Sequence, residues 1–548
     1  MIYGLTFLVP GLFSIQRYNG NMRWMTTILL AVILLFLLSF RVDIGLHRFF
    51  DVDEFTHVSL AMQVLHGQKP YLDFMTFFTP AYAWFLDIPL RFARSSIEVF
   101  TIARAVSVGV FIALLAVLTV LFGMMRGWKY AILPSVMLTF LPLPYDKFTE
   151  IRPDTLSALL GFAGVLFLIL GIHSSSSRLS LELRRVQDIP AWLSFFTRWE
   201  HRSAWYWFMS GISFSLSVFL LQKSVPFFLV GSVFVVAYLF HEYRIKFVRS
   251  KEFFWFTGGL GLPILLFFFW VVFVIRDIDL VRYSLTTLAL EVNKMSQFYF
   301  MEPHLYFFPT AQFFGGEGIT AGLLVNHAVW FVGIVMGTVR MFAPWLSPGT
   351  SKSRVYAESM LAVLFFLLVY LYMYYVPLKH PQYLIPIAVF ITFYASDVFV
   401  LFLNVLEKHI RPIGVLVVLA MLGVGIVTVS RETEALKMTQ TNSQQMSELE
   451  VLEKIILPDE AVVDLEGRLF NRKYAYPLCC LPFGAFEQFI SRRPSALRTV
   501  LEEKKVPYVY QGETNRISVL SGEDQGYLST YYEAVEGFNG GLFKRKNN

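Results

Sequence analysis

The chain has 548 residues, of which 56% are hydrophobic and only 16% are charged, and its mean hydropathy is +0.56. A soluble globular protein carries about a quarter charged residues, so most of this chain is expected to be solvated by lipid. The net charge of +6 is interpreted as loop charge that orients the chain in a membrane. No basic stretch is interleaved with aromatic residues, which argues against a nucleic-acid partner.

Residues 1–24 are expected to form a cytoplasmic or interfacial segment ahead of the first membrane span. The stretch from Ile2 to Ile15 is apolar, but no basic residue precedes it and Pro10 interrupts it. It therefore lacks the pattern of a cleavable signal peptide.

Eleven apolar stretches are predicted to cross the membrane, which needs about twenty mostly apolar residues per helix. The shorter ones must use flanking Trp, Tyr and Lys side chains as interfacial anchors. The stretches are Thr26–Phe40, Val99–Gly123, Tyr130–Pro144, Thr155–Ile172, Ala204–Leu221, Val225–Phe240, Phe253–Ile275, Gly318–Met336, Val355–Val376, Tyr383–Leu403 and Ile413–Val429. They predict an all-α polytopic membrane module over residues 25–430.

The distribution of Lys and Arg predicts the orientation of this module. Placing the N-terminus in the cytoplasm puts more basic residues in the inner loops, above all the pair at 184–185 and the four between 244 and 251. The stretch Phe77–Phe92 is apolar but short and holds Asp87 and Pro89, so we expect it to lie in the interface instead of crossing. The odd number of spans then places the C-terminus outside.

Residues 431–548 differ in character, because charge rises and the long apolar runs end. Apolar residues at helical spacing predict one helix, and short β-branched and aromatic runs predict strands. The expected elements are the helices Ser443–Leu457 and Ser495–Lys505 and the strands Ala461–Leu465 and Pro507–Tyr510. Together they predict a small extracytoplasmic α/β domain.

The first outer loop, residues 41–98, carries an acidic cluster ahead of an amphipathic helix. Asp51, Asp53 and Glu54 come before apolar positions that repeat every three or four residues, and Gly67 ends the pattern. The dipole of a helix favours carboxylates at its N-terminus, which keeps them ionised and able to act as a base. The alternative is that Asp53 simply caps its helix.

Further polar residues open spans on the same side. Arg152-Pro153-Asp154 stands at the start of a span with proline in the first turn, which equally suits a cap and an anchor. The large outer loop, residues 276–317, is rich in Tyr, Phe and Asn. Such residues suit sugar recognition, and they equally suit an aromatic belt at the membrane surface.

Two basic positions lie near helix ends of this outer side. Lys223 follows the fifth span, where a lysine also commonly extends to the interface. Lys379 and His380 precede Tyr383 at the start of the tenth span, and a histidine there is by itself more often structural. The stronger indication is that all these acidic and basic positions lie on the same side of the membrane. A carboxylate pair and several cations together suit an acceptor hydroxyl and a lipid-phosphate leaving group.

The pair Asp53-Glu54 after the first span, with a following interfacial helix that ends in Gly-x-x-Pro-Tyr at Tyr71, resembles the membrane glycosyltransferases of the GT-C fold. In this respect the whole chain is similar to the protein O-mannosyltransferases and the bacterial lipid A aminoarabinose transferase. Those enzymes also have a motif similar to Arg152-Pro153-Asp154 and basic residues where Lys223 and Lys379 stand.

The resemblance implies transfer of one sugar from a polyprenyl-phosphate donor to a hydroxyl of a lipid, glycan or protein acceptor, with inversion at the anomeric carbon. It implies that Asp53 is the general base and that Glu54 orients the acceptor or the base. Asp51 is an alternative base, although the adjacent glutamate favours Asp53.

The resemblance also implies how the donor is held, because positioned cations stabilise the phosphate as it leaves. The donor phosphate would be bound by Arg152, Lys223, Lys379 and His380. Supporting roles would fall to Asp51, Tyr71, Asp154 and Tyr383. Some relatives hold a divalent cation near this site, but the sequence shows no His-rich ligand set, so no metal ligand is assigned and a divalent cation stays an open question.

Two other functions are consistent with a polytopic chain. A transporter or flippase of lipid-linked sugars would commonly show inverted repeats and charges near the membrane midplane, whereas here the charges gather in loops at helix ends. A catalytically inactive GT-C subunit of a membrane assembly is the other alternative, and the intact Asp53-Glu54 pair argues against it.

Overall fold

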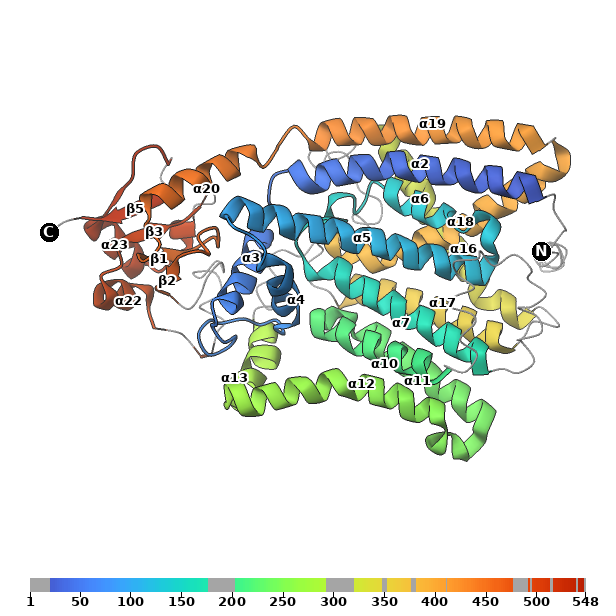
Figure 1. The fold of residues 1–548 in the computed structure, drawn as a ribbon, viewed down its shortest axis with the longest axis horizontal. Helices are drawn as coiled ribbons and strands as arrows, with labels where there is room; N and C mark the ends of the chain where they lie inside the picture. The colour runs from blue at the N-terminus through green and yellow to red at the C-terminus, as the bar shows by residue number, and fades with distance from the viewer. Residues whose placement is uncertain are drawn as a thin grey trace.

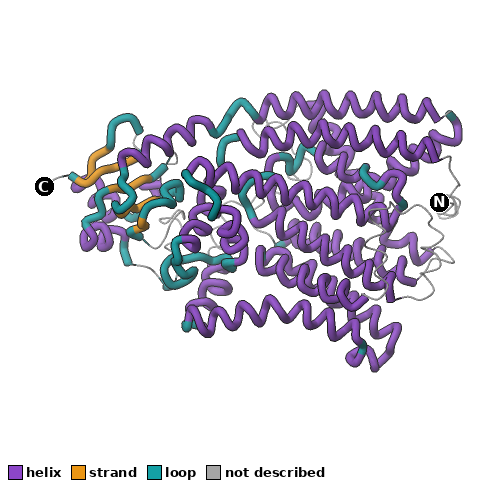
Figure 2. Tube along the Cα trace, in the orientation of Figure 1, coloured by secondary structure: helices purple, strands orange, loops and turns teal. Residues whose placement is uncertain are grey.

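The computed structural model is a long helical bundle with a small α/β domain at one end (Figures 1 and 2). The helices of the bundle run along its long axis, and the sheet lies in the end domain. The structure describes residues 20–175, 203–291, 320–346, 352–375, 381–410, 412–476, 491–492, 495–512, 516–538 and 541–546.

Long apolar helices build the bundle. They are α2 (Gly20–His47), α5 (Ser96–Arg126), α7 (Pro153–Ser175), α10 (Ser203–Leu220), α11 (Val225–Tyr243), α12 (Lys251–Trp270), α16 (Thr320–Leu346), α17 (Lys352–Tyr374), α18 (Ile385–His409) and α19 (Pro412–Lys437). Nine helices of the described ranges, all of these except α10, are long and apolar enough to cross a membrane. The chain is therefore an integral polytopic membrane protein, and the expected number of eleven spans stays a prediction.

The predicted span Tyr130–Pro144 is wrong as a continuous helix. It contains the end of a 3₁₀ turn, η2 (Trp128–Tyr130), and the helix α6 (Leu133–Phe140), whose eight residues extend only about 12 Å. Pro134 stands in the first turn of α6, and two more prolines follow its end. A proline lacks the backbone N–H that a continuing helix needs, so the helix stops.

Arg41 of α2 satisfies the carbonyl groups that the end of α6 leaves without helical partners. Its Nε donates to the carbonyl of Thr139 at 2.8 Å, and its Nη2 donates to those of Leu138 and Leu141 at 3.3 Å. Its Nη1 donates to the carbonyl of Tyr145, whose ring centre lies 3.2 Å from the guanidinium carbon. Irregular backbone at membrane depth needs such partners, which explains why this segment can lie among the spans.

Two shorter helices, α3 (Val52–Leu65) and α4 (Ala81–Leu90), lie at the end of the bundle next to the end domain (Figure 1). The chain turns after α3 at Gly67, whose φ of +82° is a conformation that glycine adopts readily. The ten residues of α4 are too few to span, in agreement with the prediction for this stretch. Its location in the interface stays a prediction.

Short helical segments complete the bundle. They are the 3₁₀ helices η3 (Asp146–Phe148), η5 (Gln222–Ser224), η6 (Arg244–Arg249) and η10 (Pro381–Leu384), the π-helices η7 (Val271–Ile275) and η8 (Tyr283–Leu288), and α13 (Ile278–Arg282). Of these, α13 and η8 belong to the predicted large outer loop, of which residues 292–317 lie outside the described part of the chain.

The C-terminal domain contains a five-stranded mixed sheet with the order β2-β1-β3-β5-β4. Its strands are β1 (Ala461–Asp464), β2 (Lys473–Tyr474), β3 (Tyr508–Tyr510), β4 (Tyr532–Ala534) and β5 (Leu542–Arg545), and its helices are α20 (Ser443–Ile455), α22 (Leu497–Lys504), α23 (Gly522–Tyr531) and the 3₁₀ helix η11 (Arg516–Val519). The first three strands are parallel and β5 pairs antiparallel with β3 and β4. Both predicted strands and both predicted helices are present, so the α/β class of the domain is confirmed. The last span, α19, reaches Lys437, beyond the predicted boundary at residue 430.

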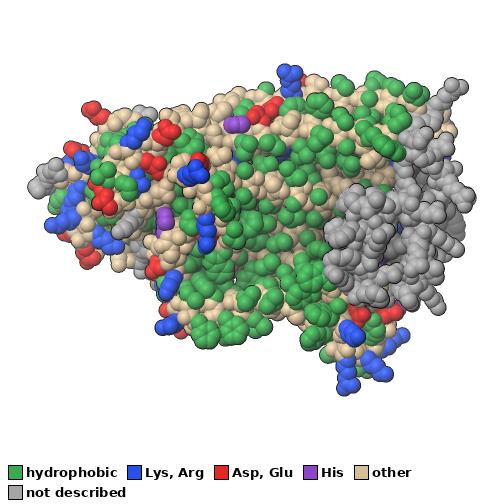
Figure 3. Space-filling view, viewed as in Figure 1, with side chains coloured by type: hydrophobic (Ala, Val, Ile, Leu, Met, Phe, Trp, Pro, Cys, Tyr) green, Lys and Arg blue, Asp and Glu red, His purple; other side chains and the backbone are tan. Residues whose placement is uncertain are grey.

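One hydrophobic cluster joins the C-terminal domain to the loop helices. It contains Phe55 of α3, Phe100 of α5 and Phe470 of the domain, and the last two rings meet edge to face with centres 5.4 Å apart. The domain is thus packed onto the helix that carries the acidic cluster. Apolar side chains cover the middle of the bundle, whereas charged side chains gather on the C-terminal domain and near the far end of α11 and α12 (Figure 3).

Candidate active site

The start of α3 separates the roles of its two aspartates. Asp51 is the N-cap: its Oδ1 accepts the backbone N–H of Asp53 at 3.0 Å, and the carboxylate of Glu54 accepts the backbone N–H of Asp51 at 2.9 Å. This reciprocal arrangement is a capping box. The reading of Asp53 as the cap is therefore wrong. Its side chain is 55% exposed and available to a substrate.

A buried arginine holds the exposed Asp53. Nη2 of Arg152 lies 2.7 Å from Oδ2 of Asp53, and the arginine side chain is only 8% exposed. The same guanidinium lies 3.6 to 3.9 Å from the carboxylates of Asp51, Glu150 and Asp154. Burial tends to raise the pKa of Asp53, but Arg152 outweighs this and lowers the pKa below 3.8. Asp53 is therefore an anion at neutral pH.

Glu54 points the other way, into the protein. Its oxygens accept hydrogen bonds from Nε and Nη2 of Arg104 at 2.5 and 2.6 Å and from the backbone N–H of Ile151 at 2.9 Å. The carboxylate is fully buried. Glu54 therefore does not reach the exposed surface on which Asp53 lies. Through these contacts Glu54 connects α3 to α5 and to the loop that carries Arg152.

Further ion pairs connect Asp51 to the loop that carries Arg152 and hold this loop in place. Nζ of Lys147 lies 3.3 Å from Asp51 and 2.7 Å from Glu150, and Glu150 also lies 3.0 Å from Arg48 of the segment after α2. Burial tends to raise the pKa of Asp51, but Lys147 and Arg152 together lower it to about 2. Asp51 is therefore engaged as a cap and an ion-pair partner, whereas Asp53 is the more exposed of the two carboxylates.

A cavity of about 60 Å³, which we call the Lys223 cavity, lies among the starts of α7, α11 and α18. Apolar side chains, most of them from α17 and α18, form much of its wall. Its polar lining comprises Asp154, Lys223, Ser224, Tyr372, Gln382 and Tyr383. Nζ of Lys223 lies 3.2 Å from the centre of the Tyr383 ring, a cation–π contact. The structure thus brings Asp154, Lys223 and Tyr383 together. Lys379 and His380 lie outside the described residues.

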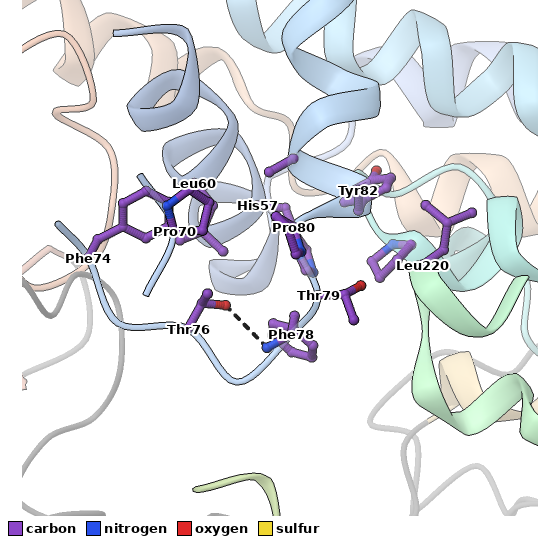
Figure 4. Close-up of a pocket in the computed structure, with 12 residues that line it drawn as sticks. His57, Leu60, Pro70, Phe74, Thr76, Phe78, Thr79, Pro80, Tyr82 and Leu220 are labelled. Atoms are coloured by element: carbon purple, nitrogen blue, oxygen red, sulfur yellow. Dashed lines mark hydrogen bonds between the residues drawn. The ribbon is translucent and has the colours of Figure 1, made fainter. Parts of the chain in front are cut away.

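A second and smaller cavity of about 20 Å³, the His57 cavity, lies between α3, α4 and the loop that joins them (Figure 4). Tyr71 belongs to this loop and stabilises its conformation. It is buried, has a φ of +73°, and donates from its hydroxyl to the carbonyl of Phe78 at 2.9 Å. Positive φ is strained in a residue other than glycine, so the surrounding structure must hold it. Tyr71 positions the cavity wall and does not face the site.

The motif Arg152-Pro153-Asp154 separates the two cavities. Pro153 lines the His57 cavity, Asp154 lines the Lys223 cavity, and Arg152 contacts Asp53. Three consecutive residues of one turn therefore contact Asp53 and line two separate pockets. An exposed anion between two cavities is the arrangement expected where two substrates meet.

Several residues of this site are absent from the sequence-based prediction. Arg104, Lys147 and Glu150 hold the loops, and His57 lines the second cavity. Two signals point to them in the sequence: Arg104 interrupts an otherwise apolar span, and His57 follows Asp53 by four residues, which is one helical turn.

Within the described ranges, no group of three or more His, Cys, Asp or Glu side chains is arranged to hold a metal ion. The carboxylates around Asp53 surround the guanidinium of Arg152, which occupies the place that a cation would need. The donor set present here thus does not fit a metal.

The bundle, the loop helices and the end domain together have the GT-C fold of polytopic membrane glycosyltransferases. A structure of ArnT from Cupriavidus metallidurans bound to undecaprenyl phosphate aligns with a TM-score of 0.59 at 13% identity, over 94% of this chain and 97% of that one. An oligosaccharyltransferase from Archaeoglobus fulgidus in the apo form aligns with a TM-score of 0.53 at 12% identity, over 95% and 74% of the two chains. Such identities show the fold alone.

No protein-family model matches the chain, and no curated protein matches its sequence.

Proposed function

We propose that the chain is a glycosyltransferase that moves a sugar from a polyprenyl-phosphate donor to an acceptor hydroxyl, with inversion at the anomeric carbon. The observation that carries the proposal is the exposed Asp53, held by buried Arg152 between two cavities. The fold supports it, since the aligned ArnT structure is bound to undecaprenyl phosphate and an aligned AglB structure contains a dolichol-phosphate.

In the proposed reaction the acceptor oxygen forms a bond to the anomeric carbon while the bond from that carbon to the phosphate oxygen breaks. The acceptor proton passes to the Asp53 carboxylate, and the polyprenyl phosphate leaves as an anion. Because a phosphate leaves without protonation, cations that receive its charge matter more than a general acid. The attack and departure occur on opposite faces of the sugar, which produces inversion.

The Lys223 cavity is the proposed donor site. Lys223 supplies the positive charge, Gln382 supplies an amide, and the apolar walls from α17 and α18 suit the first units of a polyprenyl chain. Lys379 and His380, which precede η10, are proposed to add charge at the same mouth. Glu54, Asp51, Asp154 and Tyr71 are proposed to position the site, and Tyr383 to hold Lys223 through its ring.

The proposed orientation places the N-terminus in the cytoplasm and the C-terminal domain outside. The helix α3, which carries Asp53, lies at the end of the bundle next to this domain, whereas the basic segment η6 connects α11 to α12 at the far end (Figure 1). Cytoplasmic ends of membrane proteins carry the excess of Lys and Arg, which supports this assignment.

The test is a transfer assay in lipid nanodiscs with polyprenyl-phosphate-linked monosaccharides and a membrane extract as acceptor. Release of polyprenyl phosphate is measured for the wild type, Asp53→Asn and Lys223→Ala. We expect Asp53→Asn to lower kcat by about 10²- to 10⁴-fold, the range for loss of a general base. Lys223→Ala is expected to raise the KM for the donor.

Full activity of a folded Asp53→Asn protein would contradict the proposal. Movement of the labelled donor across a proteoliposome membrane without release of polyprenyl phosphate would instead identify a flippase. A wild type that neither transfers nor transports any of the donors would favour an inactive subunit.

A further inference from the structure

The His57 cavity is not used by the donor site described above, although it touches the same motif. It lies on the other side of Pro153 from the Lys223 cavity. Most of its lining is apolar, with Leu60, Phe74, Phe78 and Ala83 among its walls. Its free space of about 20 Å³ holds about one water-sized group, such as a hydroxyl.

His57 is the ionisable group of this cavity closest in sequence to the base. It follows Asp53 by four residues on α3, so both side chains lie on one face of the helix. Its ring meets Tyr82 edge to face at 5.3 Å and lies 5.8 Å from Phe78, and Figure 4 shows these residues around the pocket. The ring is therefore held in place by aromatic contacts.

The imidazole of His57 keeps its hydrogen-bonding capacity. Among the described residues no hydrogen-bond partner of His57 is found, although its side chain is only 8% exposed. Burial, and next the charge of Arg152, lower the pKa of His57 to about 4. At neutral pH the ring is uncharged and offers one nitrogen that donates and one that accepts.

The threonines of the cavity are already engaged. The hydroxyl of Thr79 donates to the carbonyl of Phe219, and Oγ1 of Thr76 accepts the backbone N–H of Phe78 at 3.2 Å. A hydroxyl that enters this apolar space can hydrogen-bond to His57. This arrangement suits a ligand with an apolar body and a hydroxyl head.

The loop and the helix that contribute to the cavity lining also carry exposed apolar side chains. Leu72 of the loop is 43% exposed, Ile88 of α4 is 64% exposed and Phe92 after α4 is 77% exposed. Side chains of this type in an interfacial helix enter the boundary between headgroups and acyl chains. A ligand that arrives from the membrane would reach the cavity along this surface.

From this geometry we propose that the His57 cavity binds the acceptor, that the acceptor is a lipid, and that His57 hydrogen-bonds the acceptor hydroxyl and positions it against Asp53. The inference rests on the proposed function and adds the acceptor class to it. His57 binds and orients the hydroxyl, while its proton passes to Asp53 as the new glycosidic bond forms.

The test follows labelled sugar from the donor into the products of a native membrane extract, separated into lipid and protein fractions. We expect the label in the lipid fraction. The KM for the extracted lipid acceptor should rise about tenfold in His57→Phe, as for loss of one hydrogen bond, with the donor KM unchanged. His57→Asn, which keeps a donor and an acceptor group, should recover part of the affinity.

The matched control is His66→Phe, a histidine at the other end of α3 that lies outside the cavity and is exposed. It should leave both KM values unchanged. Melting temperatures identify variants that fail to fold, and His57→Asn then serves as the second variant.

An unchanged acceptor KM in His57→Phe would overturn the assignment, as would an equal rise in the KM values of donor and acceptor. Label in the protein fraction would overturn the lipid acceptor in favour of a peptide. These outcomes leave the proposed function standing, because wild type would still transfer sugar and Asp53→Asn would still abolish transfer.

Discussion

The guanidinium of Arg152 lies 2.7 Å from the carboxylate of Asp53, and the two side chains differ sharply in exposure, at 8% and 55%. The buried guanidinium of Arg152 thus holds the exposed carboxylate of Asp53 in position. Because the guanidinium also faces three further carboxylates, its charge is retained and its position is defined. The pair presents a carboxylate of low pKa at the point where the two cavities approach each other.

Replacing Arg152 with glutamine is expected to move the acid limb of the kcat/KM profile to higher pH. Without the guanidinium, burial and the charge of Asp51 both raise the pKa of Asp53. The base works only when deprotonated, so activity would be lost at a higher pH than in the wild type. The measurement is the transfer rate as a function of pH. The control is Lys147→Gln, which removes a cation that faces Asp51; an equal movement of the limb in both variants would contradict this account.

The adjacent acids Asp53 and Glu54 are expected to respond oppositely to amide substitution. Glu54→Gln breaks a fully buried ion pair with Arg104 and should lower the free energy of unfolding by about 3–5 kcal/mol. Asp53→Asn removes an exposed carboxylate and should change it by less than about 1 kcal/mol, while transfer is lost. Thermal unfolding in detergent and transfer rates measure the two effects. A stable but inactive Glu54→Gln protein would indicate direct contact of Glu54 with a substrate.

Arg41→Met is expected to lower the melting temperature by several degrees. The substitution leaves the carbonyls of Thr139 and Tyr145, and those of neighbouring residues, without donors in a buried segment. Each unsatisfied buried group costs about 1–3 kcal/mol. Ser39→Ala is the control, because its exposed hydroxyl bonds only within its own helix turn. Equal melting temperatures of the two variants would show that water reaches these carbonyls.

Asp397→Asn is expected to destabilise the protein without changing the chemistry. The buried carboxylate of Asp397 in α18 pairs with Nε of Arg126 at 2.6 Å and with Nε of Arg340 at 2.8 Å. Loss of its charge leaves buried cations poorly compensated. This should lower the free energy of unfolding by about 3–5 kcal/mol. Arg126 ends α5 at the opposite end of that helix from the active site, so the activity per folded molecule should stay constant. A loss of activity at an unchanged melting temperature would assign this cluster a functional role.

Much of the fold is predictable from local sequence. The long spans, the amphipathic helix after Asp51 and the α/β class of the end domain follow from composition and periodicity in short windows. The prolines that follow α6 also predict the end of this helix, although a count of apolar residues alone does not. The strands β2, β4 and β5 escape prediction because each is only two to four residues long and contains a charged residue, so none has the apolar run that marks β1 and β3.

The sequence by itself determined that this is a polytopic membrane protein with an acidic cluster at the start of a surface helix, because hydropathy and helix caps depend on residues close together in the chain. Only the tertiary structure decided that Asp53 faces outward and Glu54 inward. The reason is that their partners, Arg152 and Arg104, come from distant segments, and packing, not sequence spacing, brings a buried cation to one carboxylate or the other.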